Sequence, residues 1–189
     1  MASSPYATLL VDGYNAIGQW SELKRLKQEA GLEAARDALV EQLTGYSAYR
    51  NYKTQVVFDA QFSRNFDRRR AYENITELLT VVFTDFGQTA DTYIEIACAA
   101  FRDNVANYGR RIIVATSDRA QQLTVTGYGA EWMSCRQLEH DLEASVRELR
   151  QDRSRKPKTR SSRFLGNRVN EQMRQKLMQM RFGLESGEL

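Results

Sequence analysis

The sequence contains only one histidine and two cysteines. Many enzymes depend on histidine, and many secreted proteins depend on cysteine. The single histidine, His140, lies between two acidic residues and supports neither a histidine-based mechanism nor a zinc site. Cys98 and Cys135 are far apart in apolar or helical contexts, which favours buried free thiols in a reducing compartment over a disulfide. No stretch approaches the ~18 apolar residues of a membrane helix, and we expect neither a secretory signal nor a membrane partner.

The sequence also lacks the glycine-rich motifs of nucleotide-binding proteins. No G-x-G-x-x-G follows the first predicted strand, and no P-loop lysine is present. Dinucleotide-dependent enzymes and nucleoside triphosphatases are therefore disfavoured.

Short apolar runs alternate instead with segments of helical periodicity. Strands are predicted at residues 7–11, 54–58, 80–84, 111–116 and 130–133, and helices at 31–51, 90–108, from 117 onward, and at about 135–151. The polar, arginine-rich residues 60–74 predict a long irregular loop. This alternation predicts an α/β fold in which helices cover both faces of a central, mainly parallel sheet.

Positive charge is concentrated towards the C-terminus. Residues 150–168 carry +7 and residues 169–189 carry no net charge, so the total of +3 leaves −4 on residues 1–149. We expect one domain at residues 5–150 and, at residues 151–189, a basic linker followed by a helix at about 163–182. The basic segment suits a polyanion such as RNA or ribosomal RNA, or an acidic protein, and a solvated linker is the alternative. Its predicted RNA-binding residues are Arg153, Arg155, Lys156, Lys158 and Arg160.

Acidic residues follow four of the predicted strands. Asp12, Asp59 and Asp118 come at or just after strand ends, and Asp91 follows the third strand at the start of a helix. Because ligands bind at the carboxyl ends of an open parallel sheet, we expect these four carboxylates to converge on one edge. Their mutual repulsion predicts Mg²⁺ or Mn²⁺ between them. Such ions can activate water and stabilise the leaving oxygen of a phosphodiester.

Each acid also has a purely structural interpretation. Asp12 can belong to a turn, and Asp91 and Asp118 can simply stabilise helix N-termini. Their joint placement favours a catalytic site with these three residues as metal ligands. Glu95, one helical turn after Asp91, is either a further ligand or an exposed helix acid. Asn15 either orients Asp12 or a metal-bound water, or it caps the turn that follows.

Other side chains near the acids suit an RNA substrate. Tyr14 either stacks on a base or packs in the core, and Ser117 either contacts phosphate and the acids or caps a helix. The arginines of the 60–74 loop either bind phosphate or form a solvated basic loop. They are Arg64, Arg68, Arg69 and Arg70.

Four segments that carry these residues resemble the YacP-like NYN domain family, which belongs to the PIN-like nucleases. The segments are Leu10-Val11-Asp12-Gly13-Tyr14-Asn15, Val57-Phe58-Asp59-Ala60, Thr89-Ala90-Asp91-Thr92-Tyr93-Ile94-Glu95 and Ala115-Thr116-Ser117-Asp118. They occur in order between about residues 6 and 150, so we expect the resemblance to end before the basic linker and the last helix.

This resemblance implies a PIN-like three-layer fold and a metal-dependent ribonuclease of the bacterial cytoplasm or the plastid stroma. It maps the acidic site onto Asp12, Asp59, Asp91 and Asp118, with Asn15 as a polar helper. It further implies action on messenger RNA at or near ribosomes, for which we expect endonucleolytic cleavage.

Two other functions are less consistent with the sequence. A non-catalytic RNA- or ribosome-binding module with the same fold has no need to keep four acids at one edge. A haloacid-dehalogenase-like phosphatase needs a second acid two residues after its first aspartate, where this chain has Tyr14.

Overall fold

The computed structural model describes residues 4–59, 72–85 and 87–155, apart from the side chains of 152–155. The strands are β1 (Ala7–Asp12), β2 (Tyr52–Phe58), β3 (Tyr72–Asn74), β4 (Leu79–Phe83), β5 (Arg111–Ala115) and β6 (Glu131–Met133). The helices are α1 (Gly13–Gln19), α2 (Ser21–Ala30), α3 (Leu32–Arg50), α4 (Ala90–Asp103), the short 3-10 helix η3 (Val105–Asn107), α5 (Arg119–Gly127) and α6 (Cys135–Arg155).

The strands form one sheet in the order β3-β4-β2-β1-β5-β6. All neighbouring strands run parallel except β3, which pairs antiparallel with β4. The central strand β1 is buried along almost its whole length, as is typical of a parallel sheet covered on both faces. The predicted mainly parallel α/β fold is confirmed.

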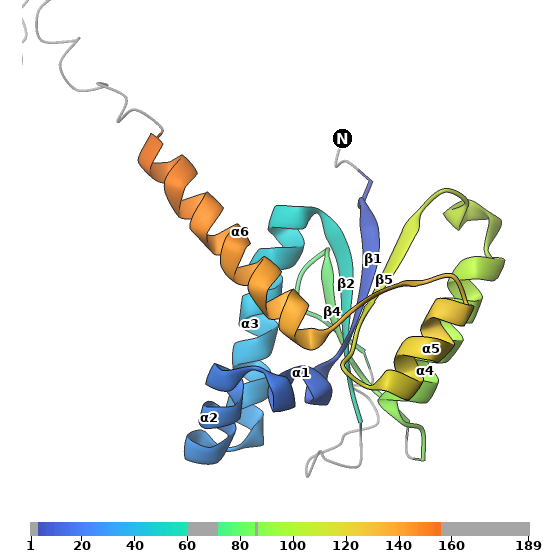
Figure 1. The fold of residues 1–189 in the computed structure, drawn as a ribbon, viewed down its shortest axis with the longest axis horizontal. Helices are drawn as coiled ribbons and strands as arrows, with labels where there is room; N and C mark the ends of the chain where they lie inside the picture. The colour runs from blue at the N-terminus through green and yellow to red at the C-terminus, as the bar shows by residue number, and fades with distance from the viewer. Residues whose placement is uncertain (1–3, 60–71, 86, 156–189) are drawn as a thin grey trace, which may run out of the picture. The chain divides into compact units, whose positions relative to one another are not determined.

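Alternate residues of the central strands face two separate cores. Leu9 and Val11 of β1 pack with α1, α2, α3 and the start of α6 on one face. Leu10 of β1 and Val57 of β2 pack with α4 and α5 on the other. Figure 1 shows these helices on opposite sides of the sheet. A strand shifted by one residue would exchange the two sets of side chains, so both cores fix the register of the strands.

The direction in which the sheet grows reverses next to β1. The chain adds β2 and β4 on one side of β1, then returns through α4 to place β5 and β6 on the other side. The helix after β1 and the helix after β5 consequently pack on opposite faces. Such a reversal leaves a crevice at the carboxyl ends of the two strands, where open α/β proteins bind ligands. This edge is the lower end of the sheet in Figure 1.

The structure adds two helices and one strand to the predicted elements. In α2 only Leu23 is buried, so this short, charged helix has too few apolar residues to be recognised from the sequence. β3 lies within residues 60–74, and the prediction of an irregular loop is therefore wrong for Tyr72–Asn74. All three residues of β3 are exposed, and they are joined to β4 by strand pairing that needs no hydrophobic pattern.

Two simpler predictions are confirmed, since Cys98 and Cys135 are buried free thiols and His140 is exposed on α6.

No helix within the described ranges is long and apolar enough to cross a membrane.

The chain divides into two compact units, residues 1–148 and residues 149–189. α6 continues to Arg155, so the prediction of a linker from residue 151 onward is wrong for residues 151–155. The rest of the predicted linker and the helix at about 163–182 lie outside the described residues. The domain boundary near residue 150 stays a prediction.

Candidate active site

Three carboxylates at the carboxyl edge of the sheet each bind the N-terminus of a helix. Oδ1 of Asp12, at the end of β1, accepts a hydrogen bond of 3.0 Å from the backbone N–H of Asn15 in α1. Asp59, just after β2, accepts one from the backbone N–H of Ala90 at the start of α4. Oδ1 of Asp118, after β5, accepts two from the first turn of α5, at 2.7 and 3.1 Å. Capping therefore fixes one oxygen of each carboxylate at a strand end.

The acids also lie close enough together to affect one another's ionisation. Asp12 is only 8% exposed, and burial, together with Asp91 and Asp59, raises its pKa from 3.8 to about 6 despite a hydrogen bond from Asn15. The pKa of Asp91 is raised by burial and by the neighbouring charges of Asp118, Asp59 and Glu95. The structure thus brings the predicted acids together around Asp91.

These charges remain without basic partners inside the described chain. None of the five acids takes part in an ion pair with another described residue. Asp91 has no hydrogen bond to any described residue either, in contrast to the capping aspartates. The available donors are carboxylate oxygens, the ligand type that Mg²⁺ and Mn²⁺ prefer.

The arrangement of donors suits a weakly caged ion. Within the described ranges, no three acidic, histidine or cysteine side chains are placed to hold one ion together. Mg²⁺ commonly binds one or two carboxylates and completes its shell with waters and substrate phosphate. The residues therefore fit an ion that is held by a pair of these acids, and the mutual repulsion of the acids favours such binding.

Asn15 connects the ends of the two strands that flank the crevice. Its Oδ1 accepts hydrogen bonds from the backbone N–H of Ser117 at 3.0 Å and from the thiol of Cys135 at 3.3 Å. Cys135 in turn donates its backbone N–H to Ser117 Oγ at 3.2 Å and accepts at its carbonyl from Trp20 Nε1 at 2.7 Å. Asn15 therefore contacts Asp12 through its backbone, and its side-chain amide holds the segment that begins α5.

Close packing fixes the start of α1. A Cβ on Gly13 would lie 2.2 Å from the ring of Phe58, so the helix can begin here only because residue 13 has no side chain. The interpretation of Asp12 as a turn residue is wrong, because Gly13 is already helical. The Tyr14 ring packs on Phe58 with centroids 5.1 Å apart, and Phe58 stacks on Phe83 at 5.7 Å. Tyr14 thus packs against the core, and its stacking on a base stays a prediction.

Most of the predicted RNA-binding side chains cannot be placed. Arg64, Arg68, Arg69, Arg70, Lys156, Lys158 and Arg160 lie outside the described residues. Arg153 and Arg155 belong to the last turn of α6, where side chains are not described. Ser117 is half-buried and binds the backbone of Cys135, so its hydroxyl has a structural role at the site.

Sequence reasoning misses the partners of Asn15. Cys135 is separated from Asn15 by 120 positions, and no local pattern links residues that far apart. Trp20 and Cys135 both read as ordinary core residues. The only available signal is that polar side chains in an apolar context usually need a hydrogen-bond partner.

One buried polar group beside the site lacks a partner. The side chain of Gln121 is in the first turn of α5, and the residue is 2% exposed. Neither its Oε1 nor its Nε2 is hydrogen-bonded to anything in the described chain. An unpaired buried amide lowers the free energy of unfolding by roughly 1–3 kcal/mol. Gln121 is therefore expected to destabilise the fold next to Asp118.

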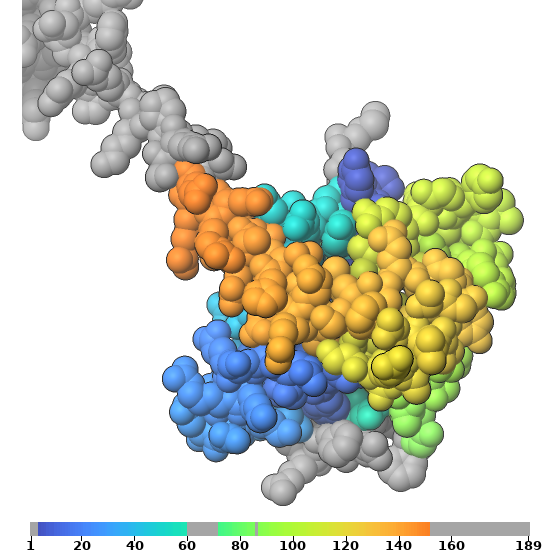
Figure 2. All heavy atoms as spheres, viewed as in Figure 1, coloured from blue at the N-terminus to red at the C-terminus, as the bar shows by residue number. Residues whose placement is uncertain are grey.

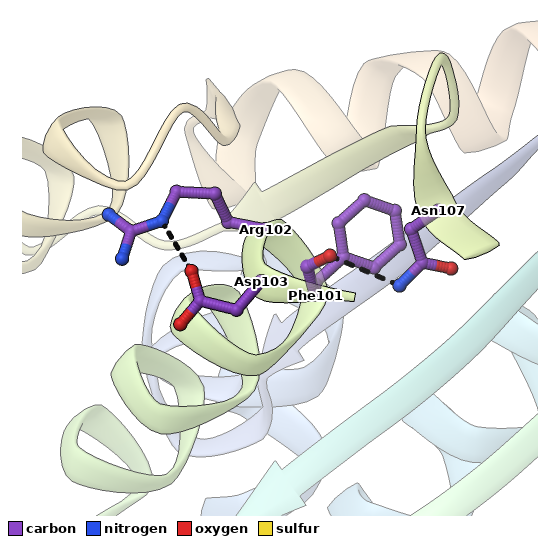
Figure 3. Close-up of polar contacts among 4 residues, drawn as sticks. All are labelled: Phe101, Arg102, Asp103 and Asn107. Atoms are coloured by element: carbon purple, nitrogen blue, oxygen red, sulfur yellow. Dashed lines mark hydrogen bonds and ion pairs between the residues drawn. The ribbon is translucent and has the colours of Figure 1, made fainter. Parts of the chain in front are cut away.

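A pocket of about 520 Å³ lies at the opposite edge of the sheet and contains none of the predicted acids. Arg102 on its wall pairs with Asp103 at 3.0 Å, and Asn107 donates to the carbonyl of Phe101 at the end of α4 (Figure 3). The Arg102 guanidinium also lies 5.3 Å from the ring centroid of Tyr128. Only the contact of Arg102 with Tyr128 joins the ends of α4 and α5, and none of these contacts involves the predicted acids.

The first turns of α6 cover the seam between the two helices that leave the crevice. In Figure 2, the surface of α6 lies between that of α1 and α2 and that of α5. The contacts of Cys135 with Asn15, Ser117 and Trp20 lie at the start of this helix. The start of α6 therefore contacts the segments that carry Asn15, Trp20 and Ser117.

Known proteins are similar to this chain in both sequence and fold. The YacP-like NYN domain profile matches residues 9–182. The "Uncharacterized protein YacP" of Bacillus subtilis strain 168 is 36% identical over 141 residues, which are 75% of this chain and 78% of that protein. A crystal structure of Rae1 (YacP) from Bacillus subtilis superimposes with a TM-score of 0.62 at 33% identity, over 96% of this chain and 99% of that chain. A point mutant of the same protein gives 0.61 at 37% identity, over 76% and 79%.

The matched range is longer than the resemblance in sequence motifs suggests. The profile extends to residue 182, so the expectation that the similarity ends near residue 150 is wrong. The basic segment at 150–168 and the residues after it up to 182 fall within the range that the profile covers.

Proposed function

Because the chain belongs to the YacP-like NYN domain family, we propose that it is a metal-dependent endoribonuclease that cleaves messenger RNA at or near ribosomes. Family membership supports a nuclease-like, RNA-related function. The finer proposal depends on one observation above all. Carboxylates from separate chain segments gather at the carboxyl edge, where burial and their mutual repulsion raise the pKa values of Asp12 and Asp91, and they have no described basic partner.

In this proposal the candidate ligands for Mg²⁺ or Mn²⁺ are Asp12, Asp91 and Asp118, with Glu95 one helical turn from Asp91. Any one ion is held by a pair of these acids, and waters and substrate phosphate complete its shell. NYN and PIN-like nucleases generally use divalent metals, and a bound ion supplies Lewis-acid stabilisation of charge on a phosphodiester. Asp59 holds the start of α4 through Ala90 and so positions Asp91.

Asn15 has a positioning role in this proposal. Its backbone binds Asp12 and its side chain binds the backbone of Ser117, next to Asp118. It therefore fixes the spacing of two acids that come from different strands. Its amide nitrogen is left to donate a hydrogen bond to water or phosphate.

The RNA is proposed to reach the site along basic and aromatic side chains. Tyr14 offers a ring beside the acids, and Ser117 lies in the segment that leads to Asp118. The arginines and lysines of the 60–71 and 150–168 segments are proposed to bind phosphate. Binding of ribosomal RNA by the second of these segments would direct cleavage to messenger RNA in translation.

The decisive experiment incubates labelled RNA with wild type and Asp12→Asn, each with Mn²⁺, with Mg²⁺ and with EDTA. We expect cleavage by the wild type that requires metal and that is abolished in Asp12→Asn. The exposed Asp37 on α3 provides the matched control, since Asp37→Asn removes the same charge elsewhere. A circular RNA, which has no ends, should be linearised if cleavage is endonucleolytic.

A non-catalytic RNA- or ribosome-binding module is the alternative function. It predicts binding of RNA that is unchanged in Asp12→Asn and no cleavage under any metal condition. Cleavage by Asp12→Asn at the wild-type rate would instead contradict the assignment of the acidic site. Co-sedimentation of the wild type with ribosomes, compared with a variant reversed in charge at residues 153–160, tests the link with translation.

A further inference from the structure

An acidic crevice needs a cation nearby to accept an RNA phosphate. Residues 1–149 carry a net charge of −4, and several acids are concentrated at the carboxyl edge. Repulsion between this edge and a phosphodiester backbone has to be offset close to the bond that is cut. A basic residue within the described part of the edge is therefore of interest, and Arg36 in the second turn of α3 is one.

Arg36 is held at this edge by an aromatic stack. Its guanidinium carbon lies 5.7 Å from the ring centroid of Phe83, at the end of β4. Phe83 stacks on Phe58, the last residue of β2, which in turn packs on Tyr14. Asp59 directly follows Phe58. The stack thus places Arg36 beside the ends of the strands that carry the acids.

No described carboxylate occupies the N–H groups of the Arg36 guanidinium. Arg36 forms no ion pair with any described acid, whereas Arg111 is bound in a bidentate pair by Glu131 at 2.6 Å. Arg36 is half-buried, so its stem is fixed while part of the head remains accessible. A planar guanidinium that is held over an aromatic ring, and that has no carboxylate partner, is already oriented to bind phosphate.

We propose that Arg36 is a substrate-positioning residue that binds a backbone phosphate of RNA next to the acidic crevice, a role that rests on the proposed ribonuclease function. The stack fixes the guanidinium before RNA arrives, so binding costs little side-chain entropy. Arg36 acts by placing the RNA strand, and the acids remain the groups nearest to the scissile bond.

Binding is measured by fluorescence anisotropy of a short labelled single-stranded RNA in EDTA, over a series of salt concentrations. We expect Arg36→Met to weaken binding about tenfold, as is typical when a charge-assisted hydrogen bond is removed. The slope of log affinity against log salt should fall by about 0.7, the value for one neutralised phosphate on a single strand. In metal-supported cleavage KM should rise while kcat stays near that of the wild type.

Arg110→Met is the matched control, because Arg110 is exposed and precedes β5 at the opposite edge of the sheet. It should leave affinity and slope within about twofold of wild type. A purely structural role for Arg36 would lower the melting temperature and leave the salt slope unchanged. Arg36→Gln serves as a second neutral variant if Arg36→Met does not fold, and Arg36→Lys should bind with intermediate affinity and the full slope.

The outcomes separate this inference from the proposed function. If wild type binds and cleaves RNA while Arg36→Met or Arg36→Gln matches Arg110→Met in affinity and slope, the role of Arg36 is overturned and the nuclease assignment stands. If wild type neither binds nor cleaves RNA, the proposed function fails, and the role of Arg36 fails with it.

Discussion

Replacement of Asp12 by asparagine tests the electrostatics of the acidic edge without any RNA. Asn keeps the shape of the side chain and an oxygen that can accept the N–H of Asn15, so the start of α1 should be preserved. It removes the charge from a group whose pKa is raised from 3.8 to about 6 by burial and by the neighbouring acids Asp91 and Asp59. In the absence of divalent metal, the change should relieve a destabilising interaction of the folded state.

The sign and size follow from proton linkage. The folded protein holds the Asp12 proton more tightly than the unfolded chain, so wild-type stability is fully present below pH 3.8 and is lost as pH rises through about 6. A change from 3.8 to about 6 corresponds to roughly 3 kcal/mol at neutral pH, at about 1.4 kcal/mol for each tenfold change in proton affinity. Part of this loss is already present at pH 4, which leaves about 2 kcal/mol between pH 4 and pH 7.5.

The measurement is urea or thermal unfolding of wild type and Asp12→Asn in EDTA at several pH values. The stability of the variant relative to wild type should increase by about 2 kcal/mol from pH 4 to pH 7.5, or by about 4–8 °C in melting temperature for a chain of this size. Any fixed cost of burying the amide cancels in this comparison. Asp37→Asn, a change at an exposed acid, should alter stability by less than about 0.5 kcal/mol. A difference between Asp12→Asn and wild type that is constant with pH would refute the reasoning.

Four further predictions concern the metal, the packing, the buried amide and the basic segment. Mn²⁺ or Mg²⁺ should stabilise wild type, by about 2.7 kcal/mol at a hundred times the dissociation constant, and Asp91→Asn or Asp118→Asn should reduce that shift in calorimetry. Gly13→Ala should destabilise the fold by about 1–3 kcal/mol, because its Cβ would meet Phe58 at 2.2 Å, whereas Gly18→Ala, with open space around it, should be neutral or stabilising in chemical unfolding. Gln121→Met should raise the free energy of unfolding by about 1 kcal/mol, because it removes an unpaired buried amide, and equal or lower stability would show that the amide has a partner in solution. Reversal of charge at Arg153, Arg155, Lys156, Lys158 and Arg160 should lower the salt slope of RNA binding by about 0.7 for each phosphate that the segment no longer binds, and an unchanged slope would mean that the segment binds no nucleic acid.

The sheet could be predicted because its burial is recorded in local sequence. Leu9, Leu10 and Val11 are all buried between two layers of helices, so β1 appears as a continuous apolar run. The acids at the strand ends could be predicted for a related reason, since topology alone brings the carboxyl ends of parallel strands together. No distances are needed to expect that Asp12 and Asp118 are neighbours.

The remaining features could not be predicted, because they depend on tertiary contacts. β3 is held by pairing of its backbone with β4, and its exposed side chains carry no signal. Arg36 reads as one more charged residue of an amphipathic helix until Phe83 is placed beneath it. The sequence likewise suggests that Asn15 acts on Asp12 through its amide, whereas Ser117 and Cys135 engage that amide.

The hydrogen bonds of Asn15 have a consequence for the order in which the protein becomes competent. Asn15 is made early in synthesis, yet its amide partners lie 102 and 120 positions later, and the indole of Trp20 waits for a carbonyl 115 positions away. Contacts of such sequence separation form late, because long loops must close first. A nascent chain that ends before Cys135 therefore carries all four aspartates but lacks the thiol that binds Asn15 and the carbonyl that binds Trp20. The hydrogen bonds around Asn15 are complete only when the first turn of α6 has been made.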